Sequence, residues 1–152
     1  MTAKSIFFIL SLFGSVGVAT TSHAGEAYSK DITVYKNPEC RCCKRWISYL
    51  KKNDFNVTEV STRDIYADKK RLGVPVKLAA CHTAVIDGYV VEGHVTTKDI
   101  RRLLLLRPDV KGIAVPGMPV GTPGMEKGSS KEPYNVMTFD EKGNAKVFVK
   151  HE

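Results

Sequence analysis

Several features that are common in other protein classes are missing from this sequence. After residue 24, the chain of 152 residues lacks an apolar run of the roughly 20 residues that a membrane-spanning helix needs. It also lacks internal repeats, and its length suits one domain with a modest hydrophobic core. We therefore expect one domain with no membrane span beyond its N-terminal segment.

Acidic residues are the scarcer charge type, with 16 Asp and Glu against 23 Lys and Arg, which gives a net charge of +7. The basic residues are spread along the chain, with small clusters at 69–71 and 101–102. Aromatic side chains are not interleaved with these clusters, as they are in many surfaces that bind single-stranded nucleic acid. The charge pattern therefore indicates a solvated basic surface and no nucleic-acid partner.

Residues 1–24 have the pattern of a secretory signal peptide. Lys4 is their only charged residue, residues 6–19 are largely apolar, and the small residue Ala24 precedes Gly25. A retained N-terminal anchor is the alternative, but the apolar run is short for a membrane span. We therefore expect cleavage after Ala24, which leaves residues 25–152 as one domain in an oxidising compartment.

The first local signals after this segment are a strand followed by a helix. Residues 31–35 alternate and are rich in β-branched side chains, which predicts a short strand. Apolar side chains then recur at the spacing of one helical face, at Cys43, Trp46, Ile47 and Leu50. Asn37 is the predicted helix cap, and Pro38 suits the first helical position.

Signals for further elements continue to the end of the chain. They predict, in order, a strand at 57–60, a helix at 63–72 capped by Ser61 or Thr62, a hairpin of strands 83–86 and 89–92, a helix capped by Thr96 or Thr97, and a second hairpin of strands 135–139 and 145–149. Short connections in the first βαβα units favour a parallel strand pair. We therefore predict an α/β fold, a thioredoxin-like βαβαββα domain with a C-terminal hairpin.

Between the last predicted helix and the final hairpin, residues 108–133 are rich in proline and glycine. They hold five of the seven prolines, together with Met118 and Met125. Such a composition is common in surface linkers. A thioether in a turn-rich loop gains little from packing, but it is a soft metal ligand. Both methionines are therefore candidate ligands, with ordinary packing as the alternative.

Three of the four cysteines are crowded together, at Cys40, Cys42 and Cys43, and the fourth is Cys81. Structural disulfides are one interpretation for an exported chain, but a bridge between such close residues closes a short loop and stabilises little. Cys40 and Cys43 also form a C-x-x-C at the predicted strand-to-helix junction, which is typical of thiol-disulfide oxidoreductases. At this junction the helix dipole favours ionised thiolates, and we expect Cys81 to face it.

The cysteines and their neighbours also predict a metal site. Soft thiolates and thioethers prefer Cu(I), with Zn(II) the main competitor. Because Cu(I) is satisfied by two or three soft donors, four thiolates favour several ions bridged by sulfur. His82 is a candidate ligand beside Cys81, although a buried histidine satisfied by the backbone is the alternative. His94 ranks below His82, and its alternative role is to cap a loop.

Four segments resemble the periplasmic copper-resistance proteins of the CopG type: residues 35–46, 81–84, 88–95 and 115–121. The resemblance implies a thioredoxin-like fold and a thiolate-bridged copper cluster held by Cys40, Cys42, Cys43 and Cys81. It also implies a periplasmic location, a role in copper tolerance and interconversion of Cu(I) and Cu(II), the reaction of a copper oxidoreductase. The implied partners are copper ions and other periplasmic copper-handling proteins. Met118 and Met125 match the methionine loop of that family.

The predicted signal peptide can be tested directly. Because cleavage is expected after Ala24, the exported protein should have the intact mass of residues 25–152. Mass spectrometry of protein from a periplasmic extract measures this. A mass that still includes residues 1–24 would contradict the prediction and would favour the membrane anchor.

Overall fold

The computed structural model describes residues 28–152, and the predicted signal peptide lies outside these residues. The elements are β1 (Asp31–Lys36), α1 (Arg41–Lys52), β2 (Asn56–Ser61), α2 (Ile65–Arg71), the 3-10 helix η1 (Val76–Leu78), β3 (His82–Ile86), β4 (Tyr89–Glu92), α3 (Thr97–Leu106), β5 (Gly112–Ala114), β6 (Tyr134–Phe139) and β7 (Ala145–His151). Within residues 28–152, no helix combines the length and apolar character needed to cross a membrane.

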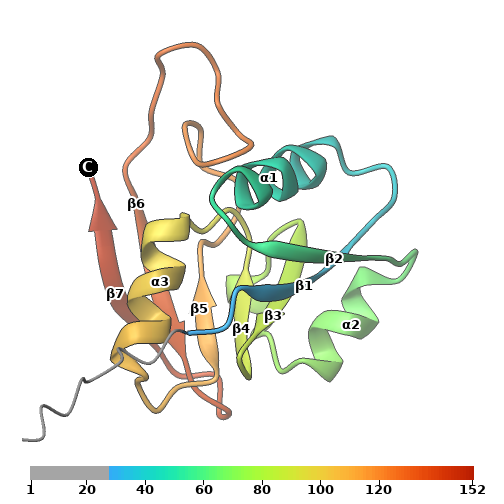
Figure 1. Ribbon diagram of the computed structural model, residues 1–152. Helices are drawn as coiled ribbons and strands as arrows, with labels where there is room; N and C mark the ends of the chain where they lie inside the picture. The colour runs from blue at the N-terminus through green and yellow to red at the C-terminus, as the bar shows by residue number, and fades with distance from the viewer. Residues whose placement is uncertain (1–27) are drawn as a thin grey trace, which may run out of the picture.

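The seven strands of the described chain form one sheet, in the order β2-β1-β3-β4-β5-β6-β7 (Figure 1). β1 and β2 are parallel, and β3 and β4 form the predicted antiparallel hairpin. The predicted final hairpin is β6 and β7, and β6 extends the sheet by pairing with β5. The predicted α/β fold, with its βαβαββα order, is therefore confirmed.

β5 links the first four strands to the C-terminal hairpin, and sequence reasoning missed it. It has three residues, all buried, and runs parallel to β4 and antiparallel to β6. It lies inside the proline- and glycine-rich segment that was interpreted as a loop. A strand this short carries no readable periodicity, so its partners on both sides define it.

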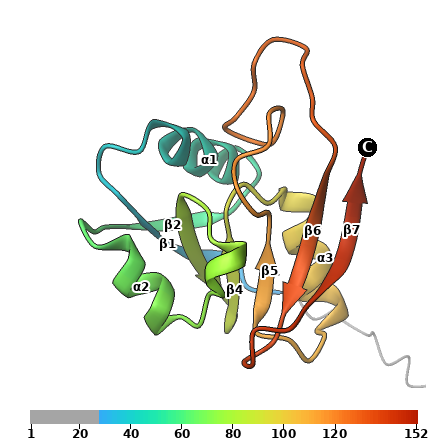
Figure 2. The same ribbon diagram turned by 180° about the vertical axis from the view of Figure 1, so that it is seen from behind.

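One face of the sheet carries the larger hydrophobic core. α1 and α3 cover this face, and Figure 2 shows α3 behind β5 and β6 in the view from the other side. The buried residues include Ile32, Val34, Trp46, Leu50, Ala84, Val91, Ile100 and Leu103. The indole N–H of Trp46 donates to the carbonyl oxygen of Val95 at 2.9 Å, so that the one polar group of this ring is satisfied. This packing fixes α1 with its first turn near the C-terminal end of β1.

The other face carries a smaller core beneath α2 and η1. Its buried apolar residues are Val74, Leu78, Val90, Ala114 and Phe139. Unusually for a core-facing position, α2 presents a lysine, Lys69, which is buried.

α1 begins later than predicted, because a turn precedes it. Its first residue is Arg41 and its N-cap is Cys40, whose sulfur accepts a hydrogen bond from the Cys43 backbone N–H at 3.2 Å. The predicted cap, Asn37, instead accepts from the backbone N–H of Glu39 at 2.9 Å. Asparagine commonly closes such a turn with its own side chain, which explains the error.

α2 also begins later than predicted. Its first residue is Ile65 and its N-cap is Asp64, so neither Ser61 nor Thr62 is the cap. Ser61 ends β2, and the Thr62 hydroxyl accepts from the backbone N–H of Asp64 in the turn before the helix. The cap of α3 is Thr96, one of the two predicted residues.

The loop between β5 and β6 packs against α1. Gly124 adopts φ +87°, and a Cβ added there would lie 2.9 Å from the carbonyl oxygen of Cys42. The guanidinium of Arg45 donates to the Gly124 carbonyl oxygen at 2.8 Å. The loop therefore reaches the first turns of α1, where the cysteines lie.

The tight approach of β5 to β4 predicts a large effect of one methyl group. A Cβ added at Gly112 would lie 2.0 Å from the carbonyl oxygen of Val90. Gly112→Ala is expected to lower the free energy of unfolding by about 3 kcal/mol. The control Gly128→Ala, where φ is +58° and nothing lies within 4 Å, is expected to cost only about 1 kcal/mol. Urea unfolding of both variants measures the difference, and equal losses would contradict close strand packing.

Candidate metal centre

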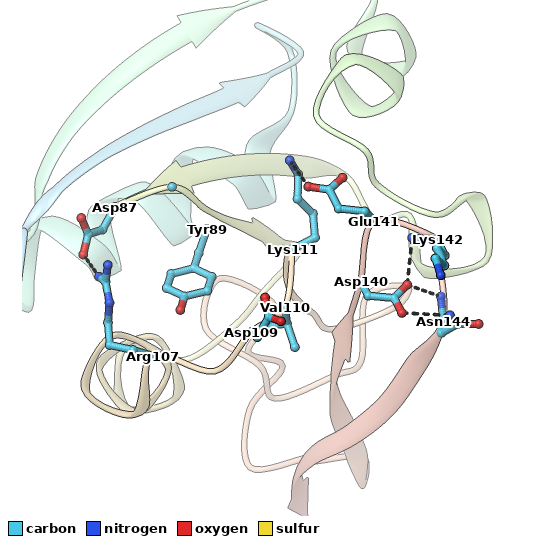
Figure 3. A pocket seen from close by; sticks show the side chains of 11 residues that line it. Asp87, Tyr89, Arg107, Asp109, Val110, Lys111, Asp140, Glu141, Lys142 and Asn144 are labelled. Atoms are coloured by element: carbon cyan, nitrogen blue, oxygen red, sulfur yellow. Dashed lines mark hydrogen bonds and ion pairs between the residues drawn. The ribbon is translucent and has the colours of Figure 1, made fainter.

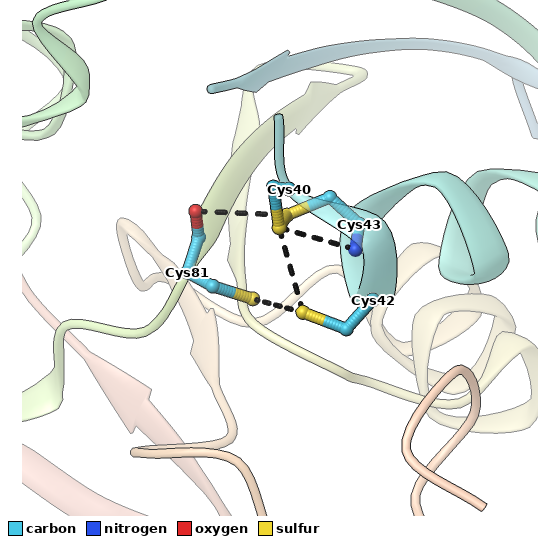
Figure 4. A group of neighbouring side chains, drawn as sticks. All are labelled: Cys40, Cys42, Cys43 and Cys81. Carbon is cyan, nitrogen blue, oxygen red and sulfur yellow. Dashed lines mark hydrogen bonds between the residues drawn. A yellow bond between two sulfur atoms is a disulfide. The ribbon is translucent and has the colours of Figure 1, made fainter. Parts of the chain in front are cut away.

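The four cysteines of the chain meet where the central strand β1 ends and its neighbour β3 begins (Figure 4). Cys40 caps α1, Cys42 and Cys43 lie in its first turn, and Cys81 directly precedes β3. Their sulfur atoms all lie within 4.8 Å of one another. Cys81 thus approaches the start of α1, as the sequence predicted.

The strand register explains this meeting. β1 and β3 are antiparallel, and Lys36 at the end of β1 pairs with His82 at the start of β3. The segment that leads from β1 to α1 and the segment that leads into β3 therefore lie side by side at the same end of these two strands. Residues separated widely in sequence share a site because of this pairing.

The cysteines are of two kinds in the structure. Cys40 and Cys43 form a disulfide, whereas Cys42 and Cys81 are free thiols. The Cys42 sulfur lies 3.4 Å from that of Cys40 and 3.6 Å from that of Cys81. Cys43 is buried, and Cys40 is partly exposed. The site therefore holds one dithiol couple in its oxidised form, together with two thiols in contact with each other.

His94 also lies beside the cysteines, although from the sequence it was a weaker candidate ligand than His82. Its Nε2 lies 3.1 Å from the Cys81 sulfur, and its Nδ1 lies 2.7 Å from the carbonyl oxygen of Pro123. A carbonyl oxygen can only accept, so Nδ1 carries the proton and Nε2 keeps its lone pair. The predicted hairpin could have revealed this, because the pairing of Thr83 with Glu92 brings the end of β4 to the start of β3.

His82 is fully buried beside Cys81. Its Nδ1 lies 3.2 Å from the Cys81 sulfur, and its Nε2 is the one buried side-chain nitrogen or oxygen in the described residues without a hydrogen-bond partner. Its ring centroid is 4.3 Å from that of Trp46 and 4.9 Å from that of His94. No backbone group forms a hydrogen bond with Nε2, so His82 is not the core histidine satisfied by the backbone that the alternative interpretation required.

Burial sets the charge state of these groups. Burial, with the neighbouring Cys42, raises the pKa of the Cys81 thiol, and the positive charge of Lys69 lowers that pKa by less. Burial likewise lowers the pKa of His82 and of His94. At neutral pH Cys81 is therefore a thiol, not the thiolate that the helix dipole predicted, because desolvation outweighs the dipole. Both imidazoles are neutral, which is the form that binds metals.

The two methionines occupy different settings in the loop. Met118 is 51% exposed, so packing does not enclose its side chain. Met125 is partly buried, and its backbone N–H donates to the carbonyl oxygen of Thr122 at 2.8 Å. Gly124, beside it, touches the first turn of α1. Met125 therefore lies in the part of the loop that is held near the cysteines.

A separate surface depression lies at the other end of the sheet (Figure 3). Its volume is about 590 Å³, and none of the cysteines lines it. Arg107 pairs with Asp87 there, and Lys111 pairs with Glu141 at 3.0 Å. Hydrogen bonds, chiefly from Asn144, lower the pKa of the Asp140 carboxyl. Both ion pairs join separate segments of the chain, and among the described residues no group of potential metal ligands was found in the depression.

Comparisons with known proteins identify the family. A family described as "Protein of unknown function, DUF411" matches residues 78–125, and no curated protein matches. Two solved structures described as "Copper resistance protein copG", form 2 and form 1, are 47% and 46% identical to this chain. Their TM-scores are 0.77 and 0.76, and the alignments cover 80% and 82% of this chain and 98% of each structure. This chain belongs to the CopG family. Membership and the cysteine group together support a copper-related function.

The side chains of this member of the CopG family suit the ligand preferences of copper. Sulfur donors select Cu(I), and imidazole nitrogen suits copper in either oxidation state. The structure offers two overlapping groups of ligand atoms, each within 4.8 Å: the four cysteines, and Cys81 with His82 and His94. The unpartnered Nε2 of His82 is a further sign that the polar groups of this site are not all satisfied within the protein.

The buried histidines make stability depend on pH. Because burial lowers the pKa of His82 and His94, the unfolded chain binds protons below about pH 6.5 that the folded chain does not. The free energy of unfolding should therefore fall as the pH drops through that value, by at most about 1.4 kcal/mol per pH unit for each histidine.

Urea unfolding of the metal-free protein at about pH 7.5 and about pH 5.5 measures this fall. The variant His82→Phe keeps a ring against Trp46 but removes one titrating group. Its stability should therefore depend less on pH. The same dependence in parent and variant would contradict the assignment of a neutral, buried His82.

Proposed function

We propose that this protein is an exported copper-binding protein in which thiolates bridge several copper ions, and that it contributes to copper tolerance. The observation that carries the proposal is the approach of all four cysteine sulfurs to within 4.8 Å of one another. Three of them lie at the start of α1 and the fourth directly precedes β3, and the disulfide between Cys40 and Cys43 uses only two of the four sulfurs.

Charge favours several ions over one. Four thiolates around a single Cu(I) would leave a large excess of negative charge in a site that is mostly shielded from water. Bridging allows each sulfur to serve two ions, and additional Cu(I) then balances the charge. Zinc, which takes four ligands in one tetrahedron, is the main competitor, and the soft thioethers of the loop favour Cu(I) over it.

Redox interconversion of copper is the second part of the proposal. The disulfide between Cys40 and Cys43 is the oxidised form of a two-electron couple. Its dithiol form can reduce two Cu(II) to two Cu(I), forming the disulfide and releasing two protons. In the reverse direction the disulfide accepts two electrons from two Cu(I), takes up two protons and returns to the dithiol. An activity of this kind would make the protein a copper oxidoreductase.

The remaining candidate ligands have supporting roles in this proposal. His94 presents the lone pair of Nε2 beside Cys81, and its Nδ1–H bond to Pro123 fixes the ring orientation. His82 lies on the other side of the same sulfur. Met118 and Met125 supply soft thioethers from the loop and retain copper without being needed for folding. Copper ions, and other periplasmic copper-handling proteins that deliver or receive them, are the proposed partners.

An anaerobic Cu(I) titration of the reduced protein tests the cluster. Saturation is expected above one copper per chain, because bridging sulfurs hold several ions. Cys81→Ser should lower that stoichiometry, whereas Ala79→Ser should not, since it adds a hydroxyl nearby without removing the thiol. Saturation at one copper, or equal stoichiometry in Cys81→Ser and the parent, would contradict a bridged cluster. One tightly bound zinc would point to a structural zinc site.

A second candidate function is thiol-disulfide exchange at Cys40 and Cys43. The observation in its favour is the disulfide at the start of α1, with Cys40 partly exposed and Cys43 buried. This function leaves Cys42, Cys81 and His94 without a role. Reduction of insulin by the metal-free, reduced protein, combined with copper binding at or below one ion, would favour it over the copper cluster.

A further inference from the structure

Lys69 and Glu92 form an ion pair inside the protein, on the opposite face of the sheet from α1. Lys69 Nζ lies 2.6 Å from Glu92 Oε1, and the residues are 4% and 0% exposed. Lys69 also donates to the Thr83 hydroxyl at 2.9 Å, and that hydroxyl donates to Glu92 Oε2 at 2.6 Å. The two charges and the hydroxyl therefore form a closed network that joins α2, β3 and β4.

The same carboxylate reaches the segment that carries Cys81. Glu92 Oε1 accepts a hydrogen bond from the backbone N–H of Ala80 at 2.6 Å. Ala80 is the residue directly before Cys81 and follows η1, outside any strand. Without this bond, no ladder hydrogen bond would hold the chain at Ala80. The buried ion pair is thus connected through one backbone bond to a proposed copper ligand.

The residues after Glu92 contact the same segment. The backbone N–H of Gly93 donates to the carbonyl oxygen of His82 at 3.1 Å. A Cβ added at Gly93 would lie 2.7 Å from the Cβ of Ala80, so only glycine allows this approach. His94 Nε2 then meets the Cys81 sulfur at 3.1 Å. Residues 92–94 therefore contact residues 80–82 from one end to the other.

Stability alone does not explain a buried pair of this kind. Removing two charges from water is costly, and well-packed apolar side chains often replace a buried ion pair with no loss of stability. What apolar side chains cannot do is accept the hydrogen bond from Ala80. The feature specific to this pair is a fixed carboxylate oxygen, which the ion pair with Lys69 holds in place, beneath the Cys81 segment.

We propose that Lys69 and Glu92 are positioning residues that hold Cys81 at the start of α1, within reach of Cys42. The role of this position in copper binding rests on the proposed function. The positioning itself does not, because it concerns the metal-free protein. Loss of the network would leave the fold in place and release the segment 79–81.

The test uses the double variant Lys69→Met/Glu92→Leu. It removes both charges together, so no charge is left buried without a partner and the net charge of the chain is unchanged. It also removes the acceptor for Ala80. The thermal midpoint of unfolding checks that the variant is folded. Thiol modification of the reduced, metal-free protein, quantified separately for Cys42 and Cys81 by peptide mass spectrometry, measures access to each sulfur.

The expected result is a rise of about tenfold in the modification rate of Cys81 relative to Cys42, with a folded variant. The matched control is Lys36→Met, which removes another buried lysine, 3% exposed, whose partner is Glu59 on β2. This control should leave the ratio of the two rates as in the parent. A purely structural role for the network would lower the thermal midpoint without changing that ratio.

Two outcomes would overturn the proposal: a folded double variant with the parent's ratio, or the same rise in Lys36→Met. If the double variant does not fold, Thr83→Val, which removes one member of the network and retains the ion pair, is measured in the same way and should give a smaller rise. Cu(I) stoichiometry of the double variant should fall as in Cys81→Ser. A changed ratio in a protein that binds no copper would support positioning and refute the proposed function, so the two failures are distinguishable.

Discussion

The antiparallel pairing of β1 with β3 is the constraint on which the site depends. It places Val34 opposite Ala84 in the buried core, and it places Lys36, at the end of β1, opposite His82, at the start of β3. A slip of one residue in this register would turn the core side chains of a strand toward the other face, so burial specifies the register strongly. Cys81 therefore meets the first turn of α1 because apolar side chains several residues away are buried, and the cysteines themselves need not attract one another for the site to form.

Burial of the site has opposite consequences for its two kinds of ligand. Desolvation raises the pKa of the Cys81 thiol and lowers the pKa of His82 and His94. It therefore favours the protonated thiol and the neutral imidazoles. A soft metal that binds sulfur must displace the thiol proton, which couples metal affinity to pH. The charge of Lys69 acts in the direction that eases this displacement. The electrostatics of the site thus depend on α2, which contributes no ligand and lies on the other face of the sheet.

The sequence predicted most elements because their signals are local. The alternation of the β3–β4 hairpin, the apolar face of α1 and the Thr96 cap were each readable within a few residues. The errors occurred where the decisive partner is distant in sequence. β5 is identified only by the strands on both sides, and the place of His94 in the cysteine group only by its nearness to Cys81. Caps were misplaced where a turn competed for the same side chain, as at Asn37. The meeting of the four cysteines was predictable, but the nearby ion pair was not, because a lysine on an exposed-looking helix gives no sign that it is buried.

A disulfide and a metal cluster compete for the same sulfur atoms, and this competition relates the two proposed functions. In the structure, Cys40 and Cys43 form a disulfide, which leaves Cys42 and Cys81 as thiols. The imidazoles of His82 and His94 lie beside Cys81. Reduction would make all four sulfurs available and so give a softer ligand set. Soft sulfur favours Cu(I), whereas a set with fewer thiolates and more imidazole is better suited to Cu(II). Under the proposed function, the thiol pair that reduces Cu(II) would therefore become a disulfide and leave the Cu(I) product with two thiolates fewer, so the disulfide must be reduced again before all four sulfurs can bind copper.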